Sequence, residues 1–121
     1  MPVAGQRSPS VLSKATFRAA RHLGLSGAEL SKVVGLNVKT VSCLDQGKWD
    51  VSPDTKESRR AAQLVRLFCS LDALVVGDPS KVSAWMGLYN RALDGIPREL
   101  IQSPQGLLTT LDYLDAMRAT S

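Results

Sequence analysis

Asp112 and Asp115 are the two carboxylates whose spacing best suits a pair for general acid–base chemistry. They lie three residues apart, so on a helix they would share one face. A working pair needs a nearby base, nucleophile or metal to separate the roles of the two carboxyls. Nothing basic or metal-like accompanies them in the sequence, so we interpret both as part of a solvated helix face.

The other reactive side chains predict neither catalysis nor metal binding. His22 is the only histidine and has no serine or cysteine nucleophile motif around it. Cys43 and Cys69 form no CxxC pair, and a zinc site would need four ligands. No glycine-rich phosphate-binding loop is present. We therefore expect no enzyme activity, no cofactor, no metal, and two free thiols in a reducing compartment.

Positive charge gathers in the N-terminal half of the chain. Residues 1–60 carry ten Lys and Arg against five Asp and Glu, whereas residues 61–121 carry five against six. This asymmetry favours a polyanionic partner for the first half only. No apolar run approaches the roughly 20 residues that span a bilayer, and the first ten residues lack the apolar centre of a secretion signal. We expect a cytoplasmic protein without a membrane partner.

Hydrophobic periodicity predicts helices along the chain, and no segment shows the alternation of a half-buried strand. Residues 1–10 hold two prolines and a glycine and are predicted to form a flexible arm. A helix is expected from Val11 to a glycine cap at Gly24, and a longer one over roughly 56–76. The fold class is therefore predicted to be all-α.

Two short helices are predicted between these longer ones. Ser26 and Glu29 have the spacing of a capping box at the start of the first, which ends at Gly35. Asn37 is suited to cap the second, which ends at Gly47. Both helices are so short, about eight residues, that only tertiary packing would stabilise them.

Prolines at helix starts predict three further helices in the C-terminal part, and two of these prolines follow a capping residue. Asp78 is placed to cap a helix whose first residue is Pro79. Pro97 is expected to start a short helical turn, and Ser103 followed by Pro104 repeats the capping signal. Trp85 and Tyr89 are large amphipathic side chains of the kind enriched at interfaces.

The stretch Leu25–Lys48, LSGAELSKVVGLNVKTVSCLDQGK, resembles the helix-turn-helix of the Xre/Cro/phage-repressor family. Small Ala28 would let the two helices cross closely, and Gly35 would form the turn between them. Val41 and Leu44 would pack beneath the second helix. The trailing DQGK is similar to the ENGK type of ending in that family.

This resemblance implies that the second helix lies in the major groove with its N-terminal residues at base edges. The implied DNA-binding residues are Gly27, Asn37, Val38, Lys39, Ser42, Cys43 and Lys48, with Arg18 or Arg21 adding charge. Lys39 is the one strong base reader, because it can donate to guanine O6 and N7. Operator reading through two half-sites implies a homodimer. A helix-turn-helix kept only as a packing scaffold remains an alternative.

The stretch over residues 78–118, DPSKVSAWMGLYNRALDGIPRELIQSPQGLLTTLDYLDAMR, resembles the toxin-binding domain of Xre/MbcA/ParS antitoxins. The matching positions are Trp85, Asn90, Leu93, Gly95, Pro97, Leu100, Ile101, Gly106, Tyr113, Leu114 and Arg118. Tyr89 stands where the family pattern often has proline. The order, helix-turn-helix first and this domain second, is also that of the family.

The resemblance to the toxin-binding domain implies that the partner is a RES-domain toxin. Toxins of this kind degrade NAD⁺ or ADP-ribosylate a target. The antitoxin would cover the toxin's active-site cleft. The implied toxin-binding residues are Trp85, Leu93, Ile96, Pro97, Tyr113, Met117 and Arg118. Several of these equally suit the core of a small helical unit, and we favour a core position for Trp85. Arg118 is hypothesised to occupy the place of the anionic pyrophosphate.

Together these inferences predict an antitoxin of a type II toxin–antitoxin system that also represses its own operon. The predicted domains are an arm at 1–10, an Xre-like helix-turn-helix domain at 11–76 and a toxin-binding domain at 78–121. The alternative is a stand-alone helix-turn-helix repressor whose C-terminal half only dimerises.

Overall fold

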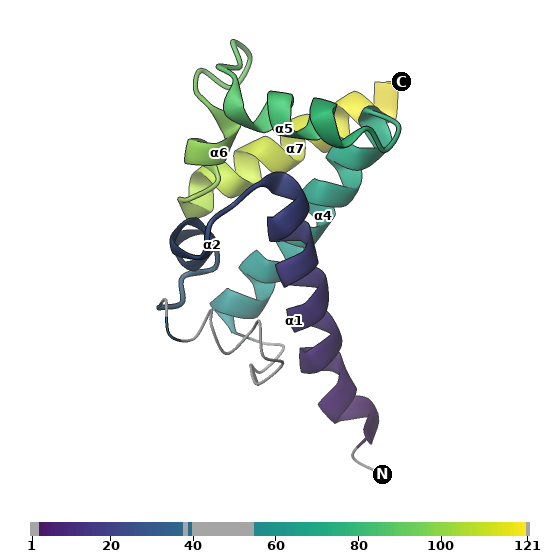
Figure 1. Ribbon diagram of the computed structural model, residues 1–121, viewed down its shortest axis with the longest axis vertical. Coiled ribbons are helices and arrows are strands. Elements are labelled where there is room, and N and C mark those ends of the chain that lie inside the picture. Colours follow the sequence, from purple (N-terminus) through teal and green to yellow (C-terminus); the bar gives the residue numbers. More distant parts are fainter. Residues whose placement is uncertain (1–2, 38, 40–54, 121) are drawn as a thin grey trace.

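The computed structural model describes residues 3–37, 39 and 55–120, and the side chains from residue 12 on within these ranges. The described part is all-α, as predicted, and its strand-type pairing is limited to one isolated bridge between Asn90 and Gly95. Figure 1 shows the arrangement of the helices. They are α1 (Val3–Leu23), α2 (Gly27–Val34), α4 (Lys56–Leu74), α5 (Pro79–Gly87), α6 (Pro97–Leu100) and α7 (Pro104–Thr120).

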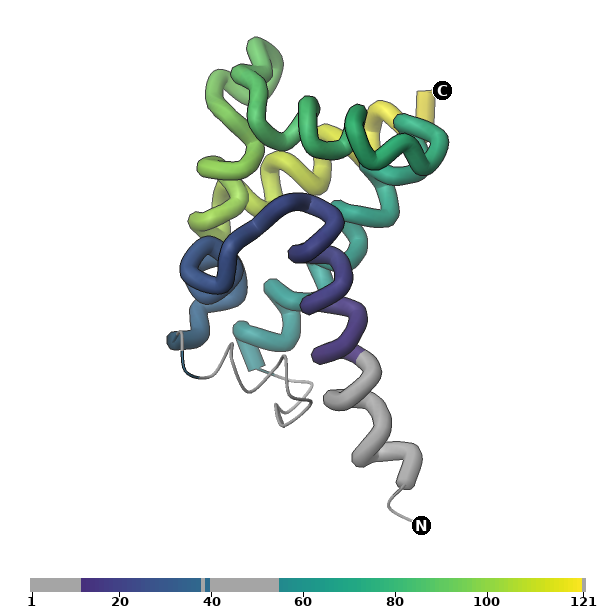
Figure 2. The backbone as a smooth tube through the Cα atoms, in the orientation of Figure 1, coloured from purple at the N-terminus to yellow at the C-terminus, as the bar shows by residue number. Residues whose placement is uncertain are grey.

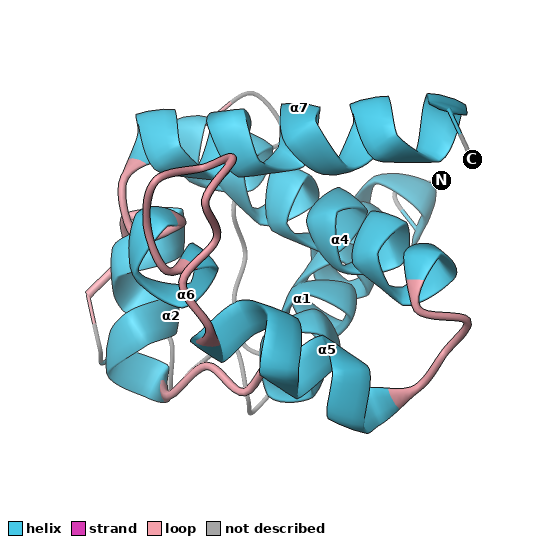
Figure 3. Cartoon of the chain, turned by 90° about the horizontal axis from the view of Figure 1, so that it is seen from above, coloured by secondary structure: helices cyan, strands magenta, loops and turns pink. Residues whose placement is uncertain are grey.

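Helix α4 is the centre of the core. It makes its most extensive contacts with α7 and then with α1, and Figure 3 shows it between α7 on one side and α1 and α5 on the other. Its fully buried leucines, Leu64, Leu67 and Leu71, repeat at spacings of three and four. Each such leucine contributes about 1.5–3 kcal/mol of burial free energy. The predicted apolar stripe of this helix is thus the main packing surface.

The backbone folds back after α4, so that α5 contacts α1 while α7 returns along α4 (Figure 2). This return depends on the turn that follows α4. Val76 and Gly77 both have left-handed backbone, with φ of 54° and 73°. The helix therefore ends at Leu74, two residues before the predicted end.

The helix caps predicted at Ser26, Gly35 and Asp78 are present, whereas the second short helix, predicted from Asn37 to Gly47, falls largely outside the described residues. Ser26 Oγ accepts from the Glu29 N–H at 3.1 Å, and Glu29 Oε1 accepts from the Ser26 N–H at 2.8 Å. Gly35 ends α2 with φ of 81°, in the left-handed region that glycine adopts readily. Asp78 caps α5, with Pro79 at its first position.

The start of α1 differs from the prediction. The helix begins at Val3, so residues 3–10, predicted as a flexible arm, belong to it. Extending an existing helix needs no new nucleation, which is the costly step in helix formation. Gly5 and Pro9 are unfavourable by about 1 and 3 kcal/mol, but they do not end the helix.

Candidate functional site

The loop between α5 and α6, residues 88–96, is closed by its own hydrogen bonds. The backbone groups of Asn90 and Gly95 bond to each other in both directions, at 2.8 and 3.2 Å. The side-chain oxygen of Asn90 accepts from the Leu93 N–H at 3.1 Å. A loop held in this way presents its side chains with little conformational freedom to lose on binding.

Two large side chains at the start of this loop are exposed, Leu88 at 64% and Tyr89 at 59%. The Tyr89 hydroxyl donates a hydrogen bond of 2.5 Å to Asp94 Oδ1. This bond favours the neutral phenol and raises the pKa of Tyr89 above its ordinary value. Exposed apolar and aromatic groups on a rigid support are typical of a protein-binding surface.

The seven residues predicted to bind a toxin differ in how far they are exposed to solvent. Trp85 is half-buried against the core, and its ring stacks on Tyr113 with centroids 6.5 Å apart. Leu93 and Ile96 are also half-buried, and Pro97 is buried at the first position of α6. Met117 and Arg118 are exposed near the end of α7. Contact roles for all seven stay predictions.

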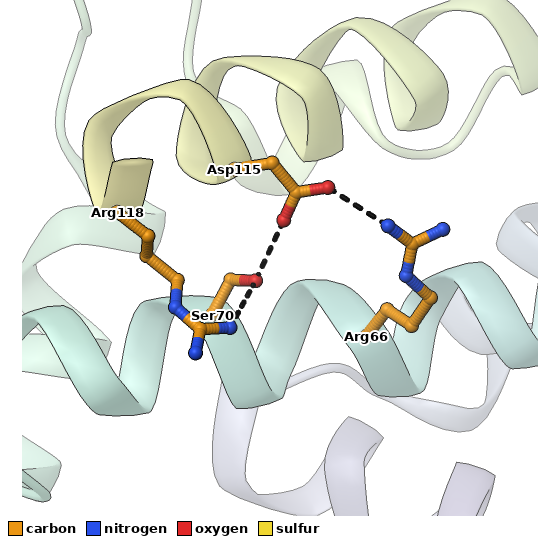
Figure 4. Close-up of polar contacts among 4 residues, drawn as sticks. All are labelled: Arg66, Ser70, Asp115 and Arg118. Carbon is orange, nitrogen blue, oxygen red and sulfur yellow. Dashed lines mark hydrogen bonds and ion pairs between the residues drawn. The ribbon is translucent and has the colours of Figure 1, made fainter. Parts of the chain in front are cut away.

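The carboxylate of Asp115 joins α7 to α4 (Figure 4). It forms an ion pair of 2.9 Å with Arg66 and accepts a hydrogen bond of 2.9 Å from the Ser70 hydroxyl. Arg118 in turn donates to Ser70 Oγ at 3.2 Å. The interpretation of Asp115 as a solvated residue without a basic neighbour was wrong, because its partner lies 49 residues away in the sequence.

Two arginines cover the glycines that end α1 and α2. These contacts were not predicted from the sequence. A Cβ at Gly24 would lie 2.7 Å from Nη2 of Arg98 in α6, and one at Gly35 would clash with the guanidinium of Arg60 in α4. Both guanidinium groups thus lie near the negative C-terminal ends of α1 and α2, where positive charge is stabilising. No local sequence signal pairs these residues.

The predicted DNA-binding residues fall only partly in the described structure. Gly27 is exposed at the start of α2, with open space around it. Asn37 and Lys39 are exposed as well. Four predicted positions lie outside the described residues: Val38, Ser42, Cys43 and Lys48. Of the two cysteines, Cys69 is described and is a free, exposed thiol.

The part of the chain that the structure describes offers neither a cluster of metal ligands nor a membrane-spanning helix. No grouping of three or more His, Cys, Asp or Glu side chains suited to a metal ion occurs among the described residues. None of their helices combines the length and apolar character needed to cross a bilayer.

Comparison with protein-family models places the chain in a class that fits this helical architecture. Residues 3–66 match the antitoxin Xre-like helix-turn-helix domain, and residues 70–119 match the antitoxin Xre/MbcA/ParS C-terminal toxin-binding domain. The first match covers more than half of the 121 residues, so the chain belongs to the antitoxins with an Xre-like helix-turn-helix. No curated protein shows significant similarity to it.

Proposed function

We propose that this chain is the antitoxin of a type II toxin–antitoxin pair, which binds and blocks a RES-domain toxin and represses its own operon. The toxin would degrade NAD⁺ or ADP-ribosylate a target. The main support for the proposal is that one chain matches both domains. Residues 3–66 match the helix-turn-helix domain and residues 70–119 match the toxin-binding domain. We propose a cytoplasmic homodimer as the working form.

The proposed toxin-binding surface has two separate regions, the rigid loop 88–96 and the C-terminal end of α7, which lie apart in Figure 3. Leu88 and Tyr89 supply exposed area on the loop. On α7, Met117 is 38% exposed and Arg118 offers a guanidinium. The stacked rings of Trp85 in α5 and Tyr113 in α7 connect these two helices. A guanidinium suits a protein cleft that accepts an anionic nucleotide, and the exposed apolar side chains of the loop would contact another part of the same partner.

Co-purification with the product of the neighbouring gene, the expected place of its toxin, tests the antitoxin proposal. We expect the chain to be retained on tagged toxin, and Arg118→Ala to weaken binding by about 2 kcal/mol, or roughly thirtyfold. Arg59→Ala, another exposed arginine far from the proposed surface in sequence, is the matched control. It should leave binding and toxin neutralisation unchanged.

Two outcomes contradict parts of this proposal. Failure of the wild-type chain to co-purify with the neighbouring toxin would favour the stand-alone repressor whose C-terminal half only dimerises. Undiminished neutralisation by Arg118→Ala would remove the role of this guanidinium as a substitute for substrate charge.

The DNA-binding half of the proposal predicts that Lys39 reads the operator. Its side chain is exposed just beyond α2. Loss of a specific lysine–base contact costs about 1–3 kcal/mol, so Lys39→Ala should weaken binding to the chain's own promoter by roughly five- to 150-fold. A gel-shift titration measures this, with Lys81→Ala in α5 as control. Equal shifts for Lys39→Ala and wild type would exclude Lys39 as a base-reading residue.

A further inference from the structure

Helix α1 carries an unusual distribution of charge. Its 21 residues include no Asp or Glu, whereas Lys14, Arg18 and Arg21 follow one another at spacings of four and three. With 100° between successive residues, these three cations fall within about 60° of the helix circumference and along about 10 Å of its axis. All three are exposed. We call this row of side chains the basic ridge.

The basic ridge lies opposite the packing face of α1. The buried residues of the described part of this helix are Ser13, Thr16, Ala19, Ala20 and Leu23. By helical periodicity their directions centre about 180° from the ridge. The ridge therefore takes no part in packing α1 onto α4, and its charges point to solvent.

Helix α1 itself supplies no acidic side chain to balance the ridge cations. Like charges four residues apart on a helix are unfavourable by a few tenths of a kcal/mol. The ion pair found within the described ranges joins Arg66 to Asp115, and the ridge has no part in it. The Arg21 guanidinium lies over the Phe17 ring, 5.3 Å from its centroid, which holds it at the surface. Lys14 and Arg18 have no comparable intramolecular role in the described structure.

We infer that the basic ridge is a second DNA contact, which binds backbone phosphates without reading sequence. This inference rests on the proposed DNA binding by the helix-turn-helix. Duplex DNA carries one negative charge per about 1.7 Å, so a row of cations about 10 Å long faces several phosphates at once. Cations on one face, with no carboxylate in the same helix, complement such a surface. The ridge adds affinity and salt dependence, while the helix-turn-helix supplies specificity.

The double variant Lys14→Gln/Arg18→Gln tests the inference. Each phosphate contact contributes about 0.9 to the slope of log K against log salt concentration, so the slope should fall by about 1.8. Affinity at low salt should fall by roughly tenfold or more, and equally on the operator and on a scrambled duplex of the same length. The control Lys81→Gln/Arg91→Gln removes the same charge at exposed positions of α5 and loop 88–96, and should leave the slope unchanged.

The possible results separate this inference from the proposed function. If the wild-type chain binds the operator and the ridge variant keeps its slope and affinity, the ridge is not a DNA contact. If ridge and control variants lose affinity equally, net charge alone accounts for the effect and the inference is again overturned. If the wild-type chain binds neither duplex, the repressor half of the proposed function fails together with the ridge.

Discussion

Replacing Gly106 with alanine is expected to lower the free energy of unfolding by about 3 kcal/mol. A Cβ at this position would overlap the main-chain carbonyl of Leu100. Since that neighbour is backbone, no rotation of a side chain relieves the clash, and α6 would have to move away from α7. Overpacking of this kind typically costs about 1–3 kcal/mol. We expect a cost at the upper end of this range because the contacted atom belongs to the backbone of α6. The hydrogen bond from the Gly106 N–H to Ser103 Oγ, 3.1 Å long, would be disturbed as well.

Denaturant unfolding monitored by circular dichroism measures this loss as a shift in midpoint at constant slope. Gly87→Ala is the matched control, because Gly87 lies in α5 and a Cβ there meets nothing within 4 Å. Alanine is the better helix former, so this variant should be as stable as wild type or more so. A Gly106→Ala midpoint equal to that of wild type would contradict the close packing of α6 against α7.

The substitution Leu114→Ala in α7 is expected to destabilise the protein by about 3 kcal/mol. Leu114 is fully buried in the core cluster that includes the central leucines of α4. Shortening a buried leucine removes its burial free energy and leaves a cavity, which together cost about 2–5 kcal/mol. The large contact between α4 and α7 makes full collapse of this cavity difficult.

Leu108→Ala, in the same helix, supplies the comparison. Leu108 is 46% exposed, so its truncation should change stability by no more than about 0.5 kcal/mol. Thermal and denaturant unfolding of both variants provide the test. Similar losses for the two would mean that α7 does not present Leu114 to the core in the way described.

Local signals in the sequence correctly predicted most helix boundaries within the described residues. The capping box of Ser26 and Glu29 and the Asp78–Pro79 start are formed within a few residues of chain, so propensity and hydrogen bonding decide them. The predicted start of α1 was wrong. The two prolines and the glycine in residues 1–10 were taken to prevent a helix, whereas an existing helix extends through them.

Contacts between distant segments could not be predicted in the same way. Arg66 and Asp115 meet only because α4 packs against α7, and Arg98 reaches Gly24 only because α6 folds back over the end of α1. Gly106 was marked by family resemblance, whereas the physical reason for it, the Leu100 carbonyl, depends on tertiary structure. The cations of α1 were visible in the sequence, whereas their exposure opposite the packing face of the helix required the fold.

The two family matches meet inside α4, since one ends at residue 66 and the other begins at residue 70. The helix continues unbroken through this point and contacts α1 and α2 as well as α7. An exchange of toxin specificity between related antitoxins by recombination must therefore splice through a continuous helix rather than through a linker. Viable chimeras have to inherit both faces of α4 in register, so changes in the toxin-binding domain and in the helix-turn-helix domain are coupled through this helix.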